Sequence, residues 1–281
     1  MTGADVPELL VGLCDDAAVF PPGSLPLEQA VPAHVEHARG RWAALVGPFI
    51  LAAADLDRLA PLAAGLPEGS FDLTVTVPLP GVADAVAVAG RIPAVRLVGL
   101  EVVVPEDVGA AEVVPALDRE VPAGVTAYVE LPRDHRRAGL VAELAGTRFL
   151  AKLRTGGVRA DLYPDELELA AAVHTAVAAG VPFKATAGLH HAVRNTDPRT
   201  GFEQHGFLNL LAATGAAADG ASVDRLVEVL ADRDPGSVAA RVRGLDARVR
   251  EWFRSFGTCS ISEPAEELVD LGLLPAGLVT D

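Results

Sequence analysis

Four ionisable side chains stand inside apolar segments of this sequence, where a charge is costly unless it is paired. Lys152 lies in AKLRTGG and Lys184 in FKATAGLHH, while Glu101 lies in LEVVVP and Glu130 ends a Val-rich segment. A buried ammonium group needs either a carboxylate partner or a lowered pKa. These residues, together with Asp16 from the Asp15-Asp16 pair near the start of the chain, are our candidate catalytic groups.

The two lysines suggest a specific chemistry. Lysines on adjacent strands lower each other's pKa by like-charge repulsion, so one of them becomes a free amine near neutral pH. A free amine attacks carbonyl carbon and forms a Schiff base. The alternative is that Lys152 and Lys184 form structural ion pairs with Glu130 or Glu101. The spacing alone leaves both interpretations open.

The segments that carry these residues alternate with Ala-rich, acid-containing segments closed by Gly or Pro. This alternation is typical of a parallel sheet with helices outside it. Eight segments are predicted to be strands, the number that closes a (β/α)8 TIM barrel of roughly 250 residues. They are Val11 to Phe20, Val46 to Ala52, Phe71 to Val77, Val95 to Val104, Val125 to Leu131, Arg148 to Leu153, Val181 to Thr186 and Trp252 to Ser260. We therefore predict an α/β fold, a single barrel domain over residues 1–281.

Helices are expected between the strands. Tyr163 to Gly180 predicts a helix with Pro164 in its first turn, and Ser222 predicts the cap of another helix. The connection between strands seven and eight is the longest, so we expect an extended helical segment there, including a helix through 206–214. Residues 189–206 have little apolar periodicity, and we expect them to form a mobile cover over the pocket.

Several strands together resemble one family, deoxyribose-phosphate aldolase and its class I aldolase relatives. The resemblance lies in K-x-x-T-G at Lys152 to Gly156, F-K-A-x-x-G at Phe183 to Gly188, and F-R-x-F-G-x-x-S at Phe253 to Ser260. Two earlier strands agree, through Leu73 to Pro78 and Glu101 to Pro105. The similar pieces occur in the right order over most of the barrel, although each is only a few residues long.

The resemblance implies a role for each matching residue. Lys152 would be the Schiff-base lysine, Lys184 the second lysine that perturbs it, and Glu101 the acid/base group, one methylene longer than the family's aspartate. Backbone amides at the strand ends would hold a phosphate, as is common after strands seven and eight of such barrels. The complete set expected to contact substrate or phosphate is Arg154, Thr155, Gly156, Thr186, Gly188, His190, His191 and Ser260.

The sequence departs from the family pattern near the expected phosphate site. Ala187 replaces a glycine, Cys259 replaces a serine, and His190 and His191 stand near where an arginine would help. Adjacent histidines are not a recognised metal-ligand spacing, so we predict neither a metal nor another cofactor. Cys259 is interpreted as a small buried residue rather than a nucleophile.

Composition limits the classes of partner. Lys and Arg total 23 against 38 Asp and Glu, a net charge of −15, which disfavours nucleic acids and anionic lipid surfaces. Two cysteines without paired spacing, an acidic rather than basic start, and no long apolar stretch favour a cytoplasmic protein. A small molecule is the expected partner, and the oligomeric state, a homo-oligomer included, stays open.

These observations lead to one preferred function and two alternatives. We predict a class I aldolase-like lyase in which Lys152 forms a Schiff base with a small carbonyl substrate, with or without a phosphate. The first alternative is a metal-assisted lyase or isomerase that uses Glu101, Glu130, His190 and His191. The second is a barrel that binds a small anion without turnover. The barrel fold by itself favours none of them.

Overall fold

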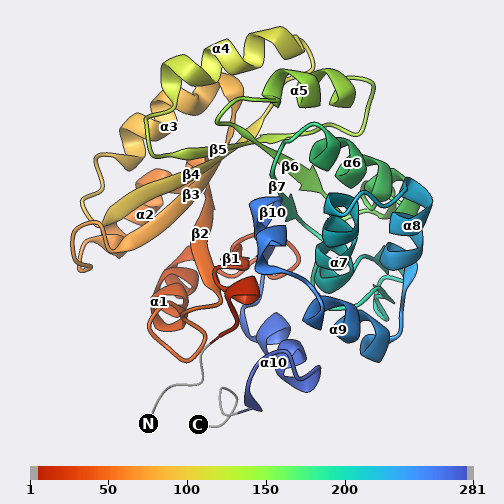
Figure 1. Cartoon of the computed structure of the whole chain (residues 1–281). Helices are drawn as coiled ribbons and strands as arrows, with labels where there is room; N and C mark the ends of the chain where they lie inside the picture. The colour runs from red at the N-terminus through yellow and green to blue at the C-terminus, as the bar shows by residue number, and fades with distance from the viewer. Residues whose placement is uncertain (1–5, 277–281) are drawn as a thin grey trace.

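Eight parallel strands close into one barrel, which confirms the predicted TIM-barrel fold (Figure 1). A computed structural model of the chain describes residues 6–276. The strands occur around the barrel in the order β1, β2, β3, β4, β5, β6, β7 and β10, with β10 returning to β1. Their bounds are β1 (Cys14–Asp16), β2 (Val46–Ala52), β3 (Phe71–Pro78), β4 (Val95–Val103), β5 (Thr126–Glu130), β6 (Leu150–Arg154), β7 (Phe183–Thr186) and β10 (Phe253–Thr258).

Strand β1 is much shorter than the predicted segment from Val11 to Phe20. Gly12 has a positive φ of 58°, which interrupts extended backbone before Cys14. At the other end, Asp16 Oδ1 accepts a hydrogen bond from the Ala18 backbone amide at 3.1 Å and turns the chain. The apolar run therefore contains two local turns that its hydrophobicity does not reveal.

Helices surround the barrel, as Figure 1 shows. They are α1 (Leu27–His37), α2 (Leu56–Ala63), α3 (Val82–Ala89), α4 (Ala110–Glu120), α5 (Arg137–Leu144), α6 (Glu166–Ala178), α7 (Phe207–Ala218), α8 (Val223–Ala231), α9 (Pro235–Arg243) and α10 (Ser262–Asp270). Short 3₁₀ helices are η1 (Glu8–Leu10), η2 (Ala53–Asp55), η3 (Leu79–Gly81), η4 (Ala160–Leu162) and η5 (Ala247–Glu251).

The caps of two helices can be compared with the predicted bounds. Ser222 caps α8 as predicted, since its hydroxyl accepts from the Arg225 amide. Helix α6 begins later than predicted, because Asp165 is its cap and accepts from the Glu168 amide. Pro164 therefore precedes the helix, and the prediction that it lies in the first turn was wrong.

The connection from β7 to β10 contains the expected extra helices. It begins with a small antiparallel hairpin, β8 (Asn195–Thr196) and β9 (Glu203–Gln204), which was not predicted. Helices α7, α8 and α9 follow, and nearly every residue of α7 is buried. Figure 1 shows α7 close to α6, α8 and α9. The predicted extended helical segment is therefore present.

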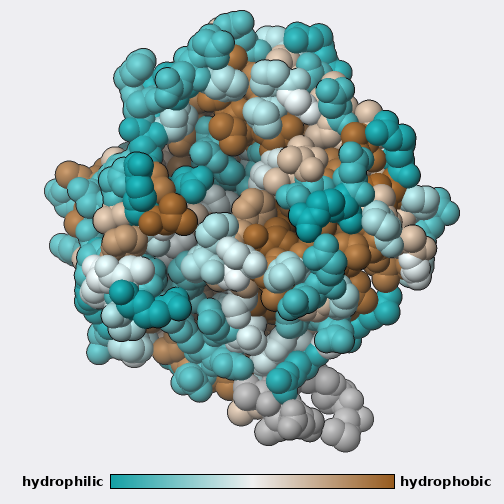
Figure 2. Space-filling view, turned by 180° about the vertical axis from the view of Figure 1, so that it is seen from behind, coloured by the Kyte–Doolittle hydropathy of each residue, from teal (hydrophilic) through white to brown (hydrophobic). Residues whose placement is uncertain are grey.

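The hydrophobic core lies between strands and helices, with Phe49, Phe71, Phe183 and Phe256 among its fully buried side chains. Many side chains inside the barrel are instead small or polar, among them Thr74, Glu101, Lys152 and Lys184. Polar residues cover most of the face seen in Figure 2, with hydrophobic residues in separate patches between them. These charged side chains inside the barrel are therefore buried away from water.

Candidate active site

Five charged side chains from five strands meet inside the barrel. Successive strand residues alternate between the two faces of a sheet, so each strand contributes only alternate residues to the interior. Lys152 on β6 is directly paired in register with Lys184 on β7 and with Glu130 on β5. Glu101 on β4 and Asp15 on β1 complete the group, which we call the lysine–carboxylate cluster.

Each lysine contacts two carboxylates. Lys184 Nζ lies 2.5 Å from Asp15 Oδ2 and 2.6 Å from Glu101 Oε1. Lys152 Nζ lies 3.0 Å from Glu101 Oε2 and 2.8 Å from Glu130 Oε2. Glu101 therefore bridges the two ammonium groups, one oxygen to each. Removing Glu101 would therefore take one partner from each of the two buried ammonium groups.

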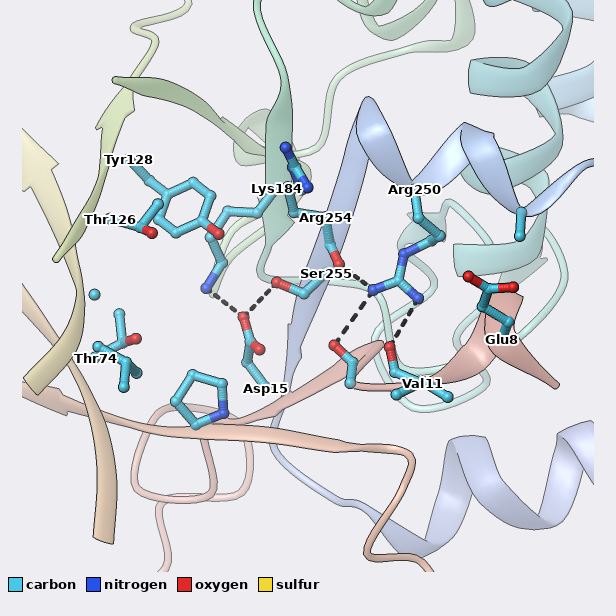
Figure 3. Close-up of a pocket in the computed structure, with 15 residues that line it drawn as sticks. Glu8, Val11, Asp15, Thr74, Thr126, Tyr128, Lys184, Arg250, Arg254 and Ser255 are labelled. Atoms are coloured by element: carbon cyan, nitrogen blue, oxygen red, sulfur yellow. Dashed lines mark hydrogen bonds and ion pairs between the residues drawn. The ribbon is translucent and has the colours of Figure 1, made fainter. Parts of the chain in front are cut away.

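The surroundings of Lys184 add two further contacts, which Figure 3 shows. Ser255 on β10 donates a hydrogen bond to Asp15 Oδ2 at 2.6 Å. The Lys184 ammonium also lies 5.2 Å from the centre of the Tyr128 ring, within the range of a cation–π interaction. Lys184 is 1% exposed and Lys152 is 5% exposed. The side chain of Glu130 is 20% exposed, so Glu130 is the member of the cluster with most contact with solvent.

The carboxylates determine the charge of both lysines. Burial lowers the pKa of Lys152, but Glu101 and Glu130 more than reverse this, so the pKa lies above its ordinary value. The pKa of Lys184 is likewise raised by Asp15 and Glu101 against the effect of burial. Burial acts to raise the pKa of Glu101, but the two lysines outweigh it and lower the pKa to about 2. The expectation that repulsion leaves one lysine as a free amine is therefore wrong for the resting protein, because three carboxylates outnumber two lysines.

Asp16 does not belong to this cluster, so the structure does not bring it together with the other predicted catalytic groups. Its Oδ2 lies 3.0 Å from Nδ1 of His34, a buried residue of α1 whose ring contacts Phe49 and Phe71. Asp16 thus lies between the barrel and α1, and the preceding residue, Asp15, occupies the interior. Parallel strands are apolar on both faces, so the pair Asp15-Asp16 gave no sign of which residue points inward.

A cavity of about 560 Å³ opens at the carboxyl-terminal end of the barrel. Its walls follow the ends of β1, β6, β7 and β10, the usual position of active sites in this fold. Three predicted binding residues line it: Gly188, His190 and His191. We call it the carboxyl-terminal cavity; other residues that line it include Pro21, Gly157, Tyr163, Ala187, Arg199 and Cys259. Lys152 lies deeper in the barrel and does not line it.

The other predicted binding residues do not line this cavity. The Thr155 hydroxyl donates to the Ala187 carbonyl at 2.6 Å, and Ser260 Oγ accepts from the Glu263 amide at the start of α10. Arg154 is exposed and donates to the Gly156 carbonyl, while Thr186 continues β7 and pairs with Arg154 and Gly257. In these contacts their polar atoms link backbone segments.

Gly156 has a packing role instead. A Cβ atom there would lie 2.7 Å from Tyr163 Cε1 and 2.8 Å from Gly188 Cα. Gly188 meets the same tyrosine and adopts a positive φ of 73°. The two glycines therefore let the β6 and β7 loops approach under the Tyr163 ring. The K-x-x-T-G and F-K-A-x-x-G motifs thus have a structural explanation beside the phosphate one.

Three residues that line the carboxyl-terminal cavity, His190, His191 and Cys259, form two side-chain pairs that were not anticipated. Cys259 Sγ lies 3.5 Å from Nδ1 of His190, and Nδ1 of His191 lies 2.6 Å from Oε1 of Glu267 on α10. Burial raises the pKa of Cys259 and lowers the pKa of His190, whereas Glu267 raises the pKa of His191. The two adjacent histidines therefore have different partners. These partners lie 69 and 76 residues away along the chain, so the local sequence did not indicate them.

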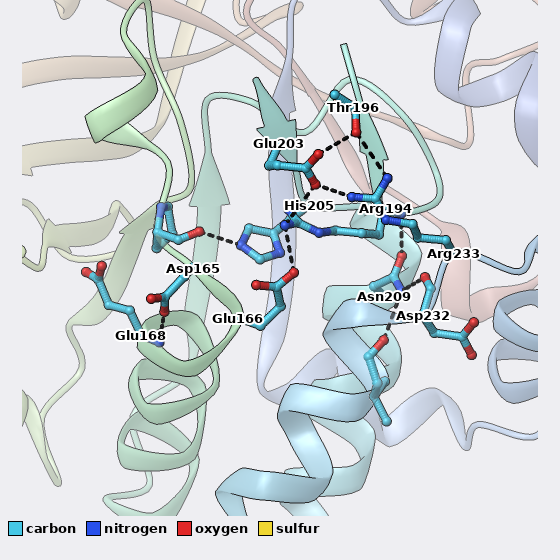
Figure 4. Close-up of polar contacts among 12 residues, drawn as sticks. Asp165, Glu166, Glu168, Arg194, Thr196, Glu203, His205, Asn209, Asp232 and Arg233 are labelled. Atoms are coloured by element: carbon cyan, nitrogen blue, oxygen red, sulfur yellow. Dashed lines mark hydrogen bonds and ion pairs between the residues drawn. The ribbon is translucent and has the colours of Figure 1, made fainter. Parts of the chain in front are cut away.

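The segment 189–206 does line the carboxyl-terminal cavity, but a buried polar network fixes its base (Figure 4). Arg194 pairs with Glu166 on α6 at 2.6 Å and with Glu203 at 3.2 Å. His205 Nε2 donates to the Pro164 carbonyl at 2.8 Å, and Asn209 accepts from the Arg194 amide. The mobility expected for 189–206 stays a prediction.

The histidines and glutamates of the metal-assisted alternative do not converge. Glu101 and Glu130 contact lysines inside the barrel, whereas His191 and His190 contact Glu267 and Cys259. Across residues 6–276, no group of three or more histidine, cysteine, aspartate or glutamate side chains is arranged to hold a metal ion. No helix in the same range is long and apolar enough to span a membrane.

Comparison of the chain with known protein families, curated proteins and solved structures gave no match. A function for this chain therefore has to be inferred from the geometry of the lysine–carboxylate cluster and of the carboxyl-terminal cavity.

Proposed function

We propose that this protein is a class I aldolase-like lyase in which the Lys152 amine forms a Schiff base with a small carbonyl substrate. The observation that carries the proposal is the pairing of two buried lysines through one glutamate, at 3.0 and 2.6 Å from Glu101. A merely structural ion pair needs one lysine and one carboxylate, whereas a proton-transfer site needs neighbouring groups that exchange protons.

Lys152 is the better nucleophile of the two lysines. Lys184 is almost completely buried, but it is held between Asp15 and Glu101, and these two carboxylates favour a permanent ammonium group. Lys152 contacts Glu130, whose side chain reaches solvent. A proton lost by Lys152 can therefore pass to Glu130 at 2.8 Å and from there to water.

The proposed reaction uses these groups in order. The neutral Lys152 amine adds to the carbonyl carbon and gives a carbinolamine. This intermediate loses water when a carboxylic acid of the cluster protonates its hydroxyl, which leaves a protonated imine. The imine accepts the electron pair of the breaking carbon–carbon bond and forms an enamine, while a carboxylate of the cluster takes the proton of the substrate's β-hydroxyl and that fragment leaves as an aldehyde or ketone. Glu101, between the lysines, or a water that it orients then moves a proton to the enamine carbon, and hydrolysis of the resulting imine releases Lys152.

The raised pKa of Lys152 has a consequence for this mechanism. The resting ammonium group must lose its proton before it attacks, so imine formation should increase with pH up to the raised pKa. Lys184 acts against the raised pKa of Lys152, because a second cation beside Glu101 weakens the attraction between that carboxylate and the Lys152 ammonium group. This is the role that the resemblance implies for the second lysine.

The carboxyl-terminal cavity supports a small substrate with an anionic group. Its volume of about 560 Å³ suits a small metabolite, and Arg199, His190 and His191 supply positive or hydrogen-bonding groups. Neither Gly156 nor Ser260 lines it, so a phosphate would contact Gly157, Gly188 and the histidines instead of the full predicted set.

Borohydride reduction in the presence of a panel of small aldehydes and ketones tests the proposal. An adduct confined to the peptide with Lys152, detected by mass mapping, is the expected result. The rival is a barrel that binds a small anion without turnover, in which both lysines keep a raised pKa and remain ammonium groups. Absence of an adduct with every carbonyl, up to alkaline pH, would support that rival instead.

A further inference from the structure

A second cavity, of about 490 Å³, opens at the opposite, amino-terminal end of the barrel. Its lining residues precede β1 and β10, as Val11 and Arg250 do, or lie on strands of the barrel, as Pro48, Gly99 and Thr126 do. We call it the amino-terminal cavity. Figure 3 shows the side chains around it, with Lys184 and Asp15 on one side and Arg250 and Glu8 on the other. None of its residues takes part in the proposed substrate site except Lys184 and its partner Asp15.

Small side chains leave this half of the barrel open. TIM-barrel interiors are normally filled by layers of bulky branched residues. Here the wall carries Gly99, Thr74, Thr126 and Ser255. A Cβ atom at Gly99 would lie 2.5 Å from the Thr74 hydroxyl, so glycine at this position keeps room for the threonine. The small side chains on these strands therefore leave the space that forms the cavity.

The cavity reverses the charge balance of the chain. The whole sequence has 23 basic and 38 acidic residues, yet Lys184, Arg250 and Arg254 line the cavity against two carboxylates, Asp15 and Glu8. Lys184 and Asp15 neutralise each other at 2.5 Å. The remaining charge near the mouth is carried by the two arginines, with Glu8 as the only acid opposite them among the lining residues.

The Arg250 guanidinium has hydrogen-bond acceptors, but none of these acceptors is a negatively charged group. Its guanidinium donates hydrogen bonds to the backbone carbonyls of Leu9, Val11, Gly12, Phe253 and Arg254. Carbonyl groups do not carry the negative charge that would balance it. Burial lowers the pKa of Arg250 more than the negative charge of Asp15 raises it, and the positive charge of Arg254 lowers it further. An anion at the mouth would relieve this repulsion.

Arg254 is free to bind such an anion. In the part of the chain that the structure describes, no hydrogen bond or ion pair joins its guanidinium to another side chain. The hydroxyl groups of Tyr128, Thr74 and Thr126 line the same cavity from β5 and β3 and add neutral donors. A guanidinium with nearby hydroxyls is the donor set that recognises carboxylates and phosphates.

We propose that the amino-terminal cavity binds a small oxyanion, a carboxylate or phosphate, through Arg254 in the field of Arg250. This site is separate from the proposed Schiff-base chemistry and stands whether or not Lys152 forms an imine. Since Lys184 lines the cavity and contacts Glu101, an anion bound there also changes the charge balance of the lysine–carboxylate cluster.

Calorimetric titration of the purified protein with inorganic phosphate and, separately, with malonate tests the site. We expect saturable binding of at least one probe, and the preference between them identifies the ligand class. Arg254→Gln should weaken binding by about tenfold or more. Arg248→Gln is the matched control, since Arg248 is exposed on the neighbouring η5, does not line the cavity and changes the net charge equally.

Two results would overturn the proposal. One is that neither probe binds saturably up to about 10 mM, a weak affinity for a metabolite site. The other is that Arg254→Gln and Arg248→Gln bind as the unmodified protein does, while Arg199→Gln abolishes binding. That pattern would place the anion in the carboxyl-terminal cavity. Melting temperatures of all three variants show whether a loss reflects unfolding, and exposed arginines are expected to change them little.

Discussion

Lys152 and Lys184 stand side by side in register on β6 and β7, and each ammonium group contacts a different oxygen of Glu101. The protonation of one lysine therefore depends on the other through a shared carboxylate. This coupling makes the two lysines experimentally distinguishable, although their side chains are identical.

Replacing each lysine by methionine should give different results in borohydride trapping. Lys152→Met removes the proposed nucleophile, so we expect no trapping at any pH. Lys184→Met leaves Lys152 with Glu101 and Glu130 and removes the neighbouring cation, so the pKa of Lys152 should rise further. Trapping should persist but move to higher pH, because the fraction of free amine at neutral pH falls about tenfold each time the pKa rises by about one.

The reverse pattern would assign the roles differently. If Lys184→Met abolishes trapping while Lys152→Met keeps it, Lys184 is the nucleophile. If neither the unmodified protein nor any variant is trapped and both variants only melt at lower temperature, the lysines are structural.

Glu101→Gln should move the pH dependence in the opposite direction. Loss of its carboxylate leaves Lys152 with Glu130 alone, so burial lowers the pKa of Lys152 with less opposition. Trapping should extend to lower pH. The protein should also lose about 3–5 kcal/mol of stability, because two buried ammonium groups lose a partner. Glu130→Gln is the control: Glu130 contacts only Lys152 and is partly exposed, so its loss should destabilise less. Equal urea midpoints for the two variants would contradict the bridging role of Glu101.

The barrel was predictable from the sequence, because its signal is repeated in every strand. Alternation of Val/Leu-rich and Ala-rich segments gave eight strands, and the structure has all eight in one barrel. Lys152, Lys184, Glu101 and Glu130 were also identifiable, since a charge in an apolar strand needs an explanation. Strand bounds were less accurate, as β1 shows, because single turn residues act over distances of two or three positions.

The details of the site depended on contacts that sequence spacing does not encode. Asp15 and Asp16 are adjacent and chemically identical. Only the orientation of β1 in the barrel determines that Asp15, and not Asp16, contacts Lys184. To predict the direction of the lysine pKa shifts, one must know how many carboxylates lie near the lysines. These carboxylates come from β1, β4 and β5. The pairing of His190 with Cys259 likewise joins two distant loops. Long-range electrostatics, rather than local propensity, was the missing information.

Gly156→Ala should destabilise the protein without touching a charged group. The new Cβ would lie 2.7 Å from Tyr163 Cε1 and 2.8 Å from Gly188 Cα, and the latter is backbone that has little freedom to move. We expect a loss of about 1–3 kcal/mol in urea unfolding. Gly65→Ala is the matched control, since nothing lies within 4 Å of a Cβ atom there. It should change stability by less than about 0.5 kcal/mol. A loss no larger for Gly156→Ala than for Gly65→Ala would mean that the loops accommodate the methyl group.

His205 should make the fold sensitive to acid. Burial lowers the pKa of His205 from 6.5 to about 4, and its Nδ1 is buried without a partner, so the folded protein keeps the ring neutral. In the unfolded chain the ring takes up a proton near its ordinary pKa. The stability contributed by the neutral ring is therefore complete above that value and is lost as the pH falls toward 4.

The expected loss from His205 between about pH 7 and about pH 5 is about 2 kcal/mol in the free energy of unfolding. His205→Gln keeps a donor for the Pro164 carbonyl but does not titrate, so its stability should decrease less over this range. His135→Gln, which removes an exposed histidine, should keep the full pH dependence of the unmodified protein. The measurement is urea unfolding at several pH values. Glu101 contributes mainly at lower pH, because its pKa in the folded protein is about 2 and its ordinary value is 4.5. Parallel stability curves for the His205→Gln and His135→Gln variants would mean that His205 accepts a proton in the folded state, with a partner that the present geometry does not provide.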